Sequence, residues 1–217
     1  MPLDLTPQEA RVLGVLIEKH LSTPDYYPLT LNATTLACNQ KSNRNPVVDY
    51  SESEVQEALD TLHRKHLVGR AITSGGRATK YRHALGEGMR LQRPETAVLA
   101  SLLLRGPQTI AEVRSRTSRM HDFDSIDSVV SVVEGLVTRE EPLVVHLPRQ
   151  AGQKEGRIAH LLAGEPEFQE DEAVNDPSAD AGSSTASRGH SVGEIQALRE
   201  RIEALEEAFA AFRKQFE

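Results

Sequence analysis

The stretch TPQEARVLGVLIEKHLS at residues 6–22 returns in pattern as QRPETAVLASLLLR at residues 92–105. A glutamate and four aliphatic residues of the first stretch have counterparts 86 positions later: Glu9, Val12, Leu13, Leu16 and Ile17 match Glu95, Val98, Leu99, Leu102 and Leu103. Repetition at one offset indicates that a single supersecondary unit occurs twice. Because the aliphatic positions follow helical spacing, we expect each unit to open with a helix.

The segments that follow the two copies also agree. A second set of aliphatic residues recurs at an offset of 74, with Val55, Ala58, Leu59 and Leu62 matching Val129, Val132, Val133 and Leu136. A short helical run precedes each set, and a pair of strands follows it, near residues 70–85 and 143–162. Three helices and a two-stranded hairpin form the element order of a winged helix. We therefore predict a mainly α protein with small β-wings, built as tandem winged-helix domains at residues 1–90 and 91–164.

Local signals mark the predicted element ends in the first unit. Thr6 and Ser51 each precede a glutamate by three residues, Glu9 and Glu54, which is the capping-box pattern of a helix N-terminus. The run SGGR at residues 74–77 predicts a hairpin turn, because a Gly-Gly pair tolerates the positive φ of a tight turn. The first wing is therefore expected at this turn.

The last quarter of the chain differs in composition from the two units. Residues 165–190 are poor in apolar side chains, so burial cannot offset their ordering entropy and an acidic disordered linker is expected. Residues 191–217 carry apolar side chains at alternating spacings of three and four, as a coiled-coil helix does. The expected dimerisation residues on this seam are Ile195, Leu198, Ile202, Leu205, Phe209, Phe212 and Phe216. Flanking charges, such as Glu194 facing Arg199, favour a parallel homodimer; a helix that folds back on its own winged helices is the alternative.

Charge is unevenly distributed along the chain. Residues 165–217 hold 13 acidic and 5 basic residues, whereas residues 1–90 hold 10 acidic and 11 basic residues, and residues 91–164 hold 9 of each. The net charge of −7 thus belongs to the tail. The two units lack the general positive excess of a strong nucleic-acid binder.

The N-terminus and the cysteine content bear on location. Residues 1–6 lack the basic start and apolar stretch of a signal peptide, and no apolar run reaches 18 residues, so we expect neither secretion nor a membrane span. The chain has a single cysteine, Cys38, which cannot form an intramolecular disulfide and fits a reducing cytoplasm. We expect Cys38 to be a small buried residue on the second helix and not a reactive thiol.

The segment from residue 23 to residue 46 is distinctive. It reads TPDYYPLTLNATTLACNQKSNRNP and ends in a dense run of amide, hydroxyl and basic side chains. With the stretch LPRQAGQKEG at residues 147–156 and the C-terminal heptads, it resembles the YceH family of bacterial proteins, whose function is unassigned. The resemblance implies tandem winged helices and no established enzymatic activity, and it supplies no catalytic residues.

Basic side chains gather on the loop before the third helix and on the first wing. In winged helices that bind duplex DNA, the third helix enters the major groove while the wing contacts phosphate. The predicted DNA-binding residues here are Lys41, Asn43, Arg44, Arg77, Lys80 and Arg82. The favoured interpretation is a DNA-associated, regulator-like protein. A solvated wing, with a loop folded by its own side-chain-to-backbone bonds, is the competing interpretation of these residues.

The third helices are acidic where DNA contact is expected. If their aliphatic positions face the core, the first exposes Glu52, Glu57 and Asp60. The second offers Asp124, Asp127 and Glu134, with no lysine or arginine before Arg139. These carboxylates would face a polyanion. They favour the alternative function, a protein-interaction adaptor whose third helices dock on a partner.

No motif points to an enzyme, a metal site or a cofactor. The eight histidines lack metal-ligand spacing with acids or cysteine, and a pair such as His63 and His66 is usually a surface or core feature. The Gly-Gly pair of the wing precedes a strand, so it is no phosphate-cradling loop. We expect the proline-flanked Tyr26 and Tyr27 to pin their loop to the core, with stacking on bases or a partner as the alternative.

Overall fold

The chain adopts a mainly helical fold with small antiparallel sheets. The computed structural model describes residues 3–71, 78–149 and 155–166 of the 217 residues. By its internal contacts the chain divides into Met1–Glu170 and Asp171–Glu217, and all described residues belong to the first unit. Arg77, most of the predicted linker and the whole predicted coiled-coil helix lie outside the described residues.

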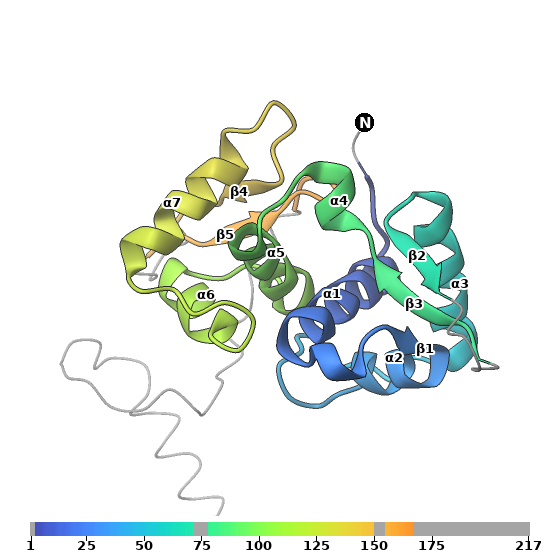
Figure 1. The fold of residues 1–217 in the computed structure, drawn as a ribbon. Helices are drawn as coiled ribbons and strands as arrows, with labels where there is room; N and C mark the ends of the chain where they lie inside the picture. The colour runs from blue at the N-terminus through green and yellow to red at the C-terminus, as the bar shows by residue number, and fades with distance from the viewer. Residues whose placement is uncertain (1–2, 72–77, 150–154, 167–217) are drawn as a thin grey trace, which may run out of the picture. The chain divides into compact units, whose positions relative to one another are not determined.

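The first repeat opens with a helix and closes with a hairpin. Its elements are α1 (Pro7–Ser22), a 3-10 turn (Pro24–Tyr26), β1 (Leu29–Thr30), α2 (Leu31–Cys38), α3 (Glu52–Arg64), β2 (Val68–Ala71) and β3 (Lys80–His83). The strands form one antiparallel sheet in the order β1-β3-β2, with Tyr81 of β3 opposite both Leu29 and Arg70. Figure 1 shows β2 alongside α3 and β3 nearer to α1.

The second repeat has the same order of elements. A short helix, α4 (Leu85–Met89), leads into α5 (Arg93–Arg105), α6 (Ile110–Thr117), α7 (Ile126–Val137), β4 (Val144–His146) and β5 (Ile158–His160). Strands β4 and β5 pair antiparallel, and Gln108 forms an isolated bridge to Ile158. This bridge takes the place that the β1–β3 pairing has in the first repeat. The predicted internal repetition therefore extends to the hydrogen bonding of the strands.

Equivalent side chains fasten the third helix to the second strand in both repeats. In the first repeat Asp60 of α3 pairs with Arg70 of β2, and in the second Glu134 of α7 lies 2.8 Å from His146 of β4. The third strands correspond as well, because His83 lies opposite Val68 and His160 lies opposite Val144. Burial lowers the pKa of His160 to about 4, so its imidazole is uncharged at neutral pH.

The predicted helix starts are confirmed by their capping bonds. The Thr6 hydroxyl accepts from the backbone N–H of Glu9 at 3.2 Å, and the Glu9 carboxylate accepts from the backbone N–H of Thr6 at 2.8 Å. Ser51 and Glu54 form the same reciprocal pair at the start of α3. These bonds satisfy backbone donors that a helix leaves without intrahelical partners in its first turn.

The two repeats share one aliphatic core. Helices α1 and α5 lie side by side at its centre (Figure 1) and make the most extensive contact between any two elements of the described fold. Cys38 is the last residue of α2 and is fully buried, so the prediction of a buried core cysteine is confirmed. Burial also raises the pKa of its thiol to about 12, which disfavours the reactive thiolate. The predicted boundary between residues 90 and 91 thus lies within a single compact unit.

Gly14 sets how closely α1 and α5 approach each other. A Cβ atom added at this position would lie 3.0 Å from Leu103 Cβ and 3.0 Å from Leu104 Cγ. Because the Cβ atom of Leu103 is fixed to the α5 backbone, the two helices would have to separate to admit a side chain.

We expect Gly14→Val to destabilise the protein by about 2 kcal/mol or more, through overpacking between α1 and α5. The matched control is Gly135→Val on α7, where an added Cβ meets no atom within 4 Å. The control should change stability by less than about 1 kcal/mol. Urea denaturation of the two variants measures the difference, and equal stabilities would show that Gly14 does not set the helix spacing.

Candidate functional site

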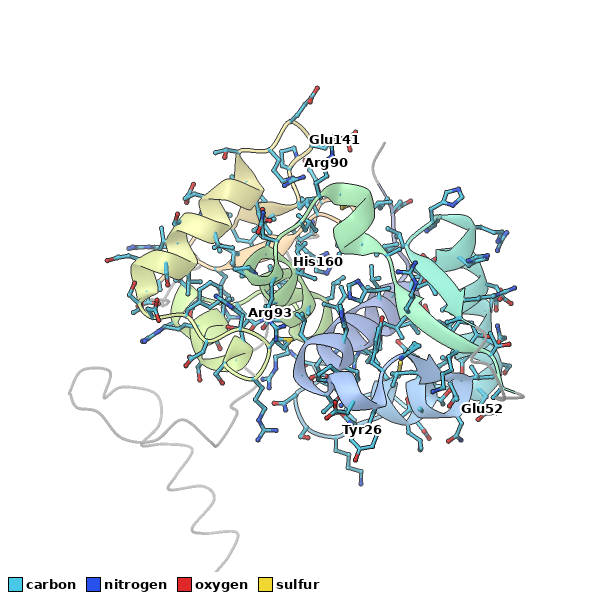
Figure 2. All side chains as sticks on the ribbon, in the orientation of Figure 1. Tyr26, Glu52, Arg90, Arg93, Glu141 and His160 are labelled. Carbon is cyan, nitrogen blue, oxygen red and sulfur yellow. The ribbon has the colours of Figure 1, made fainter. Side chains whose placement is uncertain are left out.

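The third helices expose carboxylates and apolar side chains. On α3 the exposed acidic residues include Glu52 and Glu57, and no basic residue occurs before His63 in the last turn (Figure 2 labels Glu52). On α7, Ile126 and Val130 are exposed one turn apart, 49% and 38% accessible, and the helix contains no Lys, Arg or His. The predicted acidic face of the third helices is therefore present in both repeats.

The carboxylates of α3 differ in how they are engaged. Glu54 caps the helix, and hydrogen bonds from the backbone and hydroxyl of Ser51 lower its pKa. Asp60 is held by Arg70 and accepts from Gln56 at 2.9 Å. Glu57 makes no hydrogen bond or ion pair within the described part of the chain. Glu52 accepts from Asn32 at 3.2 Å, so Glu57 is the one carboxylate of α3 without a hydrogen bond or ion pair to a described residue.

Arg44 lies inside the fold and not on a DNA-facing surface. Its side chain is fully buried and its Nη2 lies 2.6 Å from Glu18 Oε2. It also donates to the Ala37 carbonyl at 3.1 Å and to Gln40 Oε1 at 3.0 Å. Its burial contradicts the predicted phosphate contact, because every direction of the guanidinium fork is already used by the protein.

The loop that contains Arg44 joins the two repeats. The backbone N–H of Asn45 donates to the Leu104 carbonyl of α5 at 2.9 Å, and Arg105 donates to the side-chain oxygen of Asn43. Buried Arg11 of α1 donates to the Pro46 carbonyl at 2.6 Å. The amide-rich run that sequence reasoning assigned to DNA thus has a structural role, and Asn43 belongs to it.

The remaining predicted contacts fall on two separate surfaces. Lys80 and Arg82 share the outer face of β3, as alternation predicts, opposite the small residues Ala71 and Gly69 of β2. Lys41 is exposed and lines a cleft between the repeats together with cations that sequence reasoning did not single out: Lys19, Arg105, Arg116 and Arg119. The internal repeat could have identified two of these cations, since Lys19 and Arg105 are 86 positions apart and so occupy equivalent positions.

A family model described as a protein of unknown function, DUF480, matches residues 5–153. This chain belongs to the DUF480 family. A UPF0502 protein of Geotalea uraniireducens is 52% identical over 212 residues, which cover 97% of this chain and 90% of the relative. A UPF0502 protein of Pelobacter propionicus is 46% identical over 220 residues, 100% of both chains. A third, from Geotalea daltonii, is 56% identical over 169 residues, 77% of this chain and 76% of its own.

Membership of an uncharacterised bacterial family was expected from the sequence and is confirmed. The names of these DUF480 relatives state no activity, so the function of the family is unassigned. The likeness to YceH remains a resemblance, because the three relatives above carry the UPF0502 name.

The two tyrosines near the start of this DUF480 chain have different roles. Tyr27 stacks on His20 with ring centroids 4.8 Å apart, and its hydroxyl accepts from the backbone N–H of His83 at 2.6 Å. His20 and His83 are themselves joined by a 2.8 Å ring-nitrogen bond, and burial followed by the charge of Arg93 lowers the pKa of His20. Tyr27 therefore pins its loop as predicted. Tyr26 is 80% exposed, so the same prediction is wrong for Tyr26.

The described residues offer neither a cluster of metal ligands nor a membrane-crossing helix. Within them, no three His, Cys, Asp or Glu side chains gather closely enough to hold a metal ion. No helix among them combines the length and the apolar character that a membrane crossing requires.

We expect Arg44→Met to destabilise this DUF480 protein by about 3 kcal/mol, because the substitution leaves the Glu18 carboxylate and the Ala37 carbonyl partly buried without their partner. The matched control is Lys41→Met, three residues away and exposed, which should change stability by less than about 0.5 kcal/mol. Denaturant titration measures both. A stable Arg44→Met variant that had lost affinity for DNA would restore the original phosphate-contact prediction.

Proposed function

We propose that each repeat of this DUF480 protein is a winged helix and that the pair serves as a protein-interaction adaptor. The winged-helix assignment rests on the order helix, strand, helix, helix, strand, strand, with the third strand between the other two. In the second repeat the bridge between Gln108 and Ile158 supports the same assignment. The proposed mode of action is binding, and the reducing cytoplasm suggested by the single Cys38 is the proposed location.

The proposed docking surface is the exposed face of α3, and the proposed partner is a protein surface rich in Lys and Arg. The observation that carries this proposal is the charge of the helix: Glu57 is unengaged, Glu52 is exposed in the first turn, and basic residues begin only at His63. Charge complementarity of this kind accelerates association and discriminates against wrong partners. Glu52 accepts a single 3.2 Å bond from Asn32, which leaves most of its acceptor capacity for a partner.

The second repeat contributes a different kind of contact. Ile126 and Val130 expose apolar surface on one side of α7, beside the acidic Asp127. Interfaces between proteins combine a desolvated apolar centre with a polar rim, and α7 has both parts. A third helix that inserts into the major groove would instead bring these carboxylates and apolar groups against DNA phosphates and base edges.

Duplex DNA is the second candidate partner, and one observation favours it. Lys80 and Arg82 lie on the same outer face of the first sheet, and the neighbouring Gly69 and Ala71 add little bulk there. Two cations on a flat, small-residue surface suit contact with a phosphate backbone. This candidate uses the sheet and not α3, so one substitution on α3 separates the two proposals.

We expect Glu57→Lys to weaken docking of the protein partner. Its effect on the affinity for DNA should be no larger than that of the same charge change at a control position. The control is Glu140→Lys, an exposed position between α7 and β4. A photoreactive amino acid in place of exposed Ser53, one turn from Glu57, should yield a protein adduct in cells. Glu57→Lys should reduce that adduct by about fivefold or more, and Glu140→Lys should leave it unchanged.

The affinity of the same two variants for DNA distinguishes the two candidate partners. Fluorescence anisotropy with a random duplex should give equal affinities for Glu57→Lys and Glu140→Lys if α3 docks on protein. A severalfold gain that is specific to Glu57→Lys would favour DNA on α3 and overturn the adaptor proposal. An adduct at position 53 that is insensitive to Glu57→Lys would also overturn it.

We infer from the heptads that the C-terminal seam, outside the described residues, makes the adaptor a parallel homodimer. Leu205→Lys at a seam position should convert the full chain to a monomer at about 20 μM, because a charge in the seam lacks a partner. Ala204→Lys, next to it but outside the seam, should remain a dimer. Sedimentation equilibrium distinguishes the two, and a monomeric unsubstituted chain would contradict the proposal.

A further inference from the structure

A basic cleft of about 580 Å³ lies between the two repeats. Its lining includes five cations: Lys19 of α1, Lys41 of the loop after α2, Arg105 of α5, Arg116 of α6 and Arg119 just after α6. Lys19 and Arg105 hold the same position in their respective repeats, because they are 86 residues apart. The pairing of α1 with α5 therefore brings cations from both repeats to one place.

Among the described residues, Glu18 is the one carboxylate that lines this cleft, and it is already neutralised. Glu18 lies 2.6 Å from the buried guanidinium of Arg44 and 3.6 Å from Lys19. The ion pair of Arg116 with Glu112, at 3.0 Å, is partly exposed and is weak competition for a bound anion. The cleft therefore retains a positive excess that its own carboxylate does not cancel.

Two of the five cations have no partner within the described fold. Lys41 and Arg119 are exposed, and neither makes a hydrogen bond or ion pair with any described residue. Lys41 lies three residues beyond the end of α2, and Arg119 lies two residues beyond the end of α6. Both side chains are therefore available to an anion in the cleft.

The walls of the cleft hold their shape through contacts between the repeats. Asn43 accepts from Arg105, and the Asn45 backbone donates to Leu104, so the loop that carries Lys41 is fixed to α5. Arg93, labelled in Figure 2, donates to the Leu21 carbonyl at 2.9 Å and to the carbonyl of Met120, a residue of the cleft lining, at 3.0 Å. A site with such fixed walls loses little entropy when a ligand binds.

We propose that this cleft binds a small oligophosphate, meaning a molecule with two or more linked phosphate groups. Its volume falls in the range of small-molecule sites and is too small to enclose a duplex. Three of its five cations are arginines, whose planar fork matches phosphate oxygens in pairs. Hydroxyl and amide groups, including Ser22, Ser42 and Gln40, complete a lining in which Leu104 and Met120 are the apolar residues.

A bound oligophosphate would join cations of the two repeats. Lys19 and Lys41 belong to the first repeat, whereas Arg116 and Arg119 belong to the second. Clustered like charges destabilise the folded state in the absence of an anion, so the ligand should also raise the melting temperature. This inference does not rest on docking through α3, and Glu57→Lys should leave ligand binding unchanged.

The test is isothermal titration calorimetry of the full chain with inorganic tripolyphosphate at about 50 mM salt, where screening is moderate. Lys41→Gln combined with Arg119→Gln should weaken binding by about tenfold or more, since two charge-assisted contacts are lost. The matched control combines Arg90→Gln with Arg149→Gln, two exposed residues that do not line the cleft, which removes the same charge elsewhere. It should change the affinity by less than about twofold.

The same titration has outcomes that overturn the proposal. Absence of binding to the unsubstituted protein at millimolar tripolyphosphate would do so, as would equal losses in both double variants, which would indicate general charge attraction. Circular dichroism checks that both variants are folded. Titrations with ATP and with orthophosphate then identify the kind of ligand. Tighter binding of ATP than of tripolyphosphate indicates a nucleotide, whereas equal affinities indicate recognition of the phosphate chain alone. Orthophosphate that binds as tightly as tripolyphosphate would overturn the proposed requirement for linked phosphates.

Discussion

The close packing of α1 against α5 is the contact on which the rest of this structure depends. Each helix is the central element of its own repeat, and the absence of a side chain at Gly14 lets α5 approach until Leu103 and Leu104 meet the α1 backbone. Two units of this size have small cores when they are separate. Sharing one aliphatic core between the repeats buries ten of the sixteen residues of α1 and nine of the thirteen residues of α5, and it makes a single compact body.

The packing of α1 against α5 also determines how the polar groups of the loop after α2 are used. The loop has to cross from α2 to α3 while it lies against α5, so its polar groups are used to satisfy backbone and side-chain partners on both repeats. Arg44 is the extreme case, with its charge buried against Glu18 and its other donors directed to the Ala37 carbonyl and the Gln40 side chain. A buried guanidinium is tolerated only when its hydrogen-bonding capacity is used in this way.

The same pairing separates the charges of the protein into distinct surfaces. The third helices show carboxylates, and α7 adds exposed apolar groups, so their chemistry suits a protein partner better than a nucleic acid. The cations gather instead on the outer face of β3 and in the cleft between the repeats. The near-neutral net charge of residues 1–164 is therefore the sum of separate surfaces of opposite sign.

The sequence by itself determined the repetition, the helix starts at Thr6 and Ser51, the buried cysteine and the acidic face of α3. These features depend on spacing and on bonds between residues three or four apart, which a sequence displays directly. Only the packing of distant segments determines that Arg44 is buried, that Tyr27 packs while Tyr26 is exposed, and that Lys41 and Arg119 line the same cleft. The burial of a polar loop residue depends on which distant surface covers it, and that surface exists only once α1 has packed against α5.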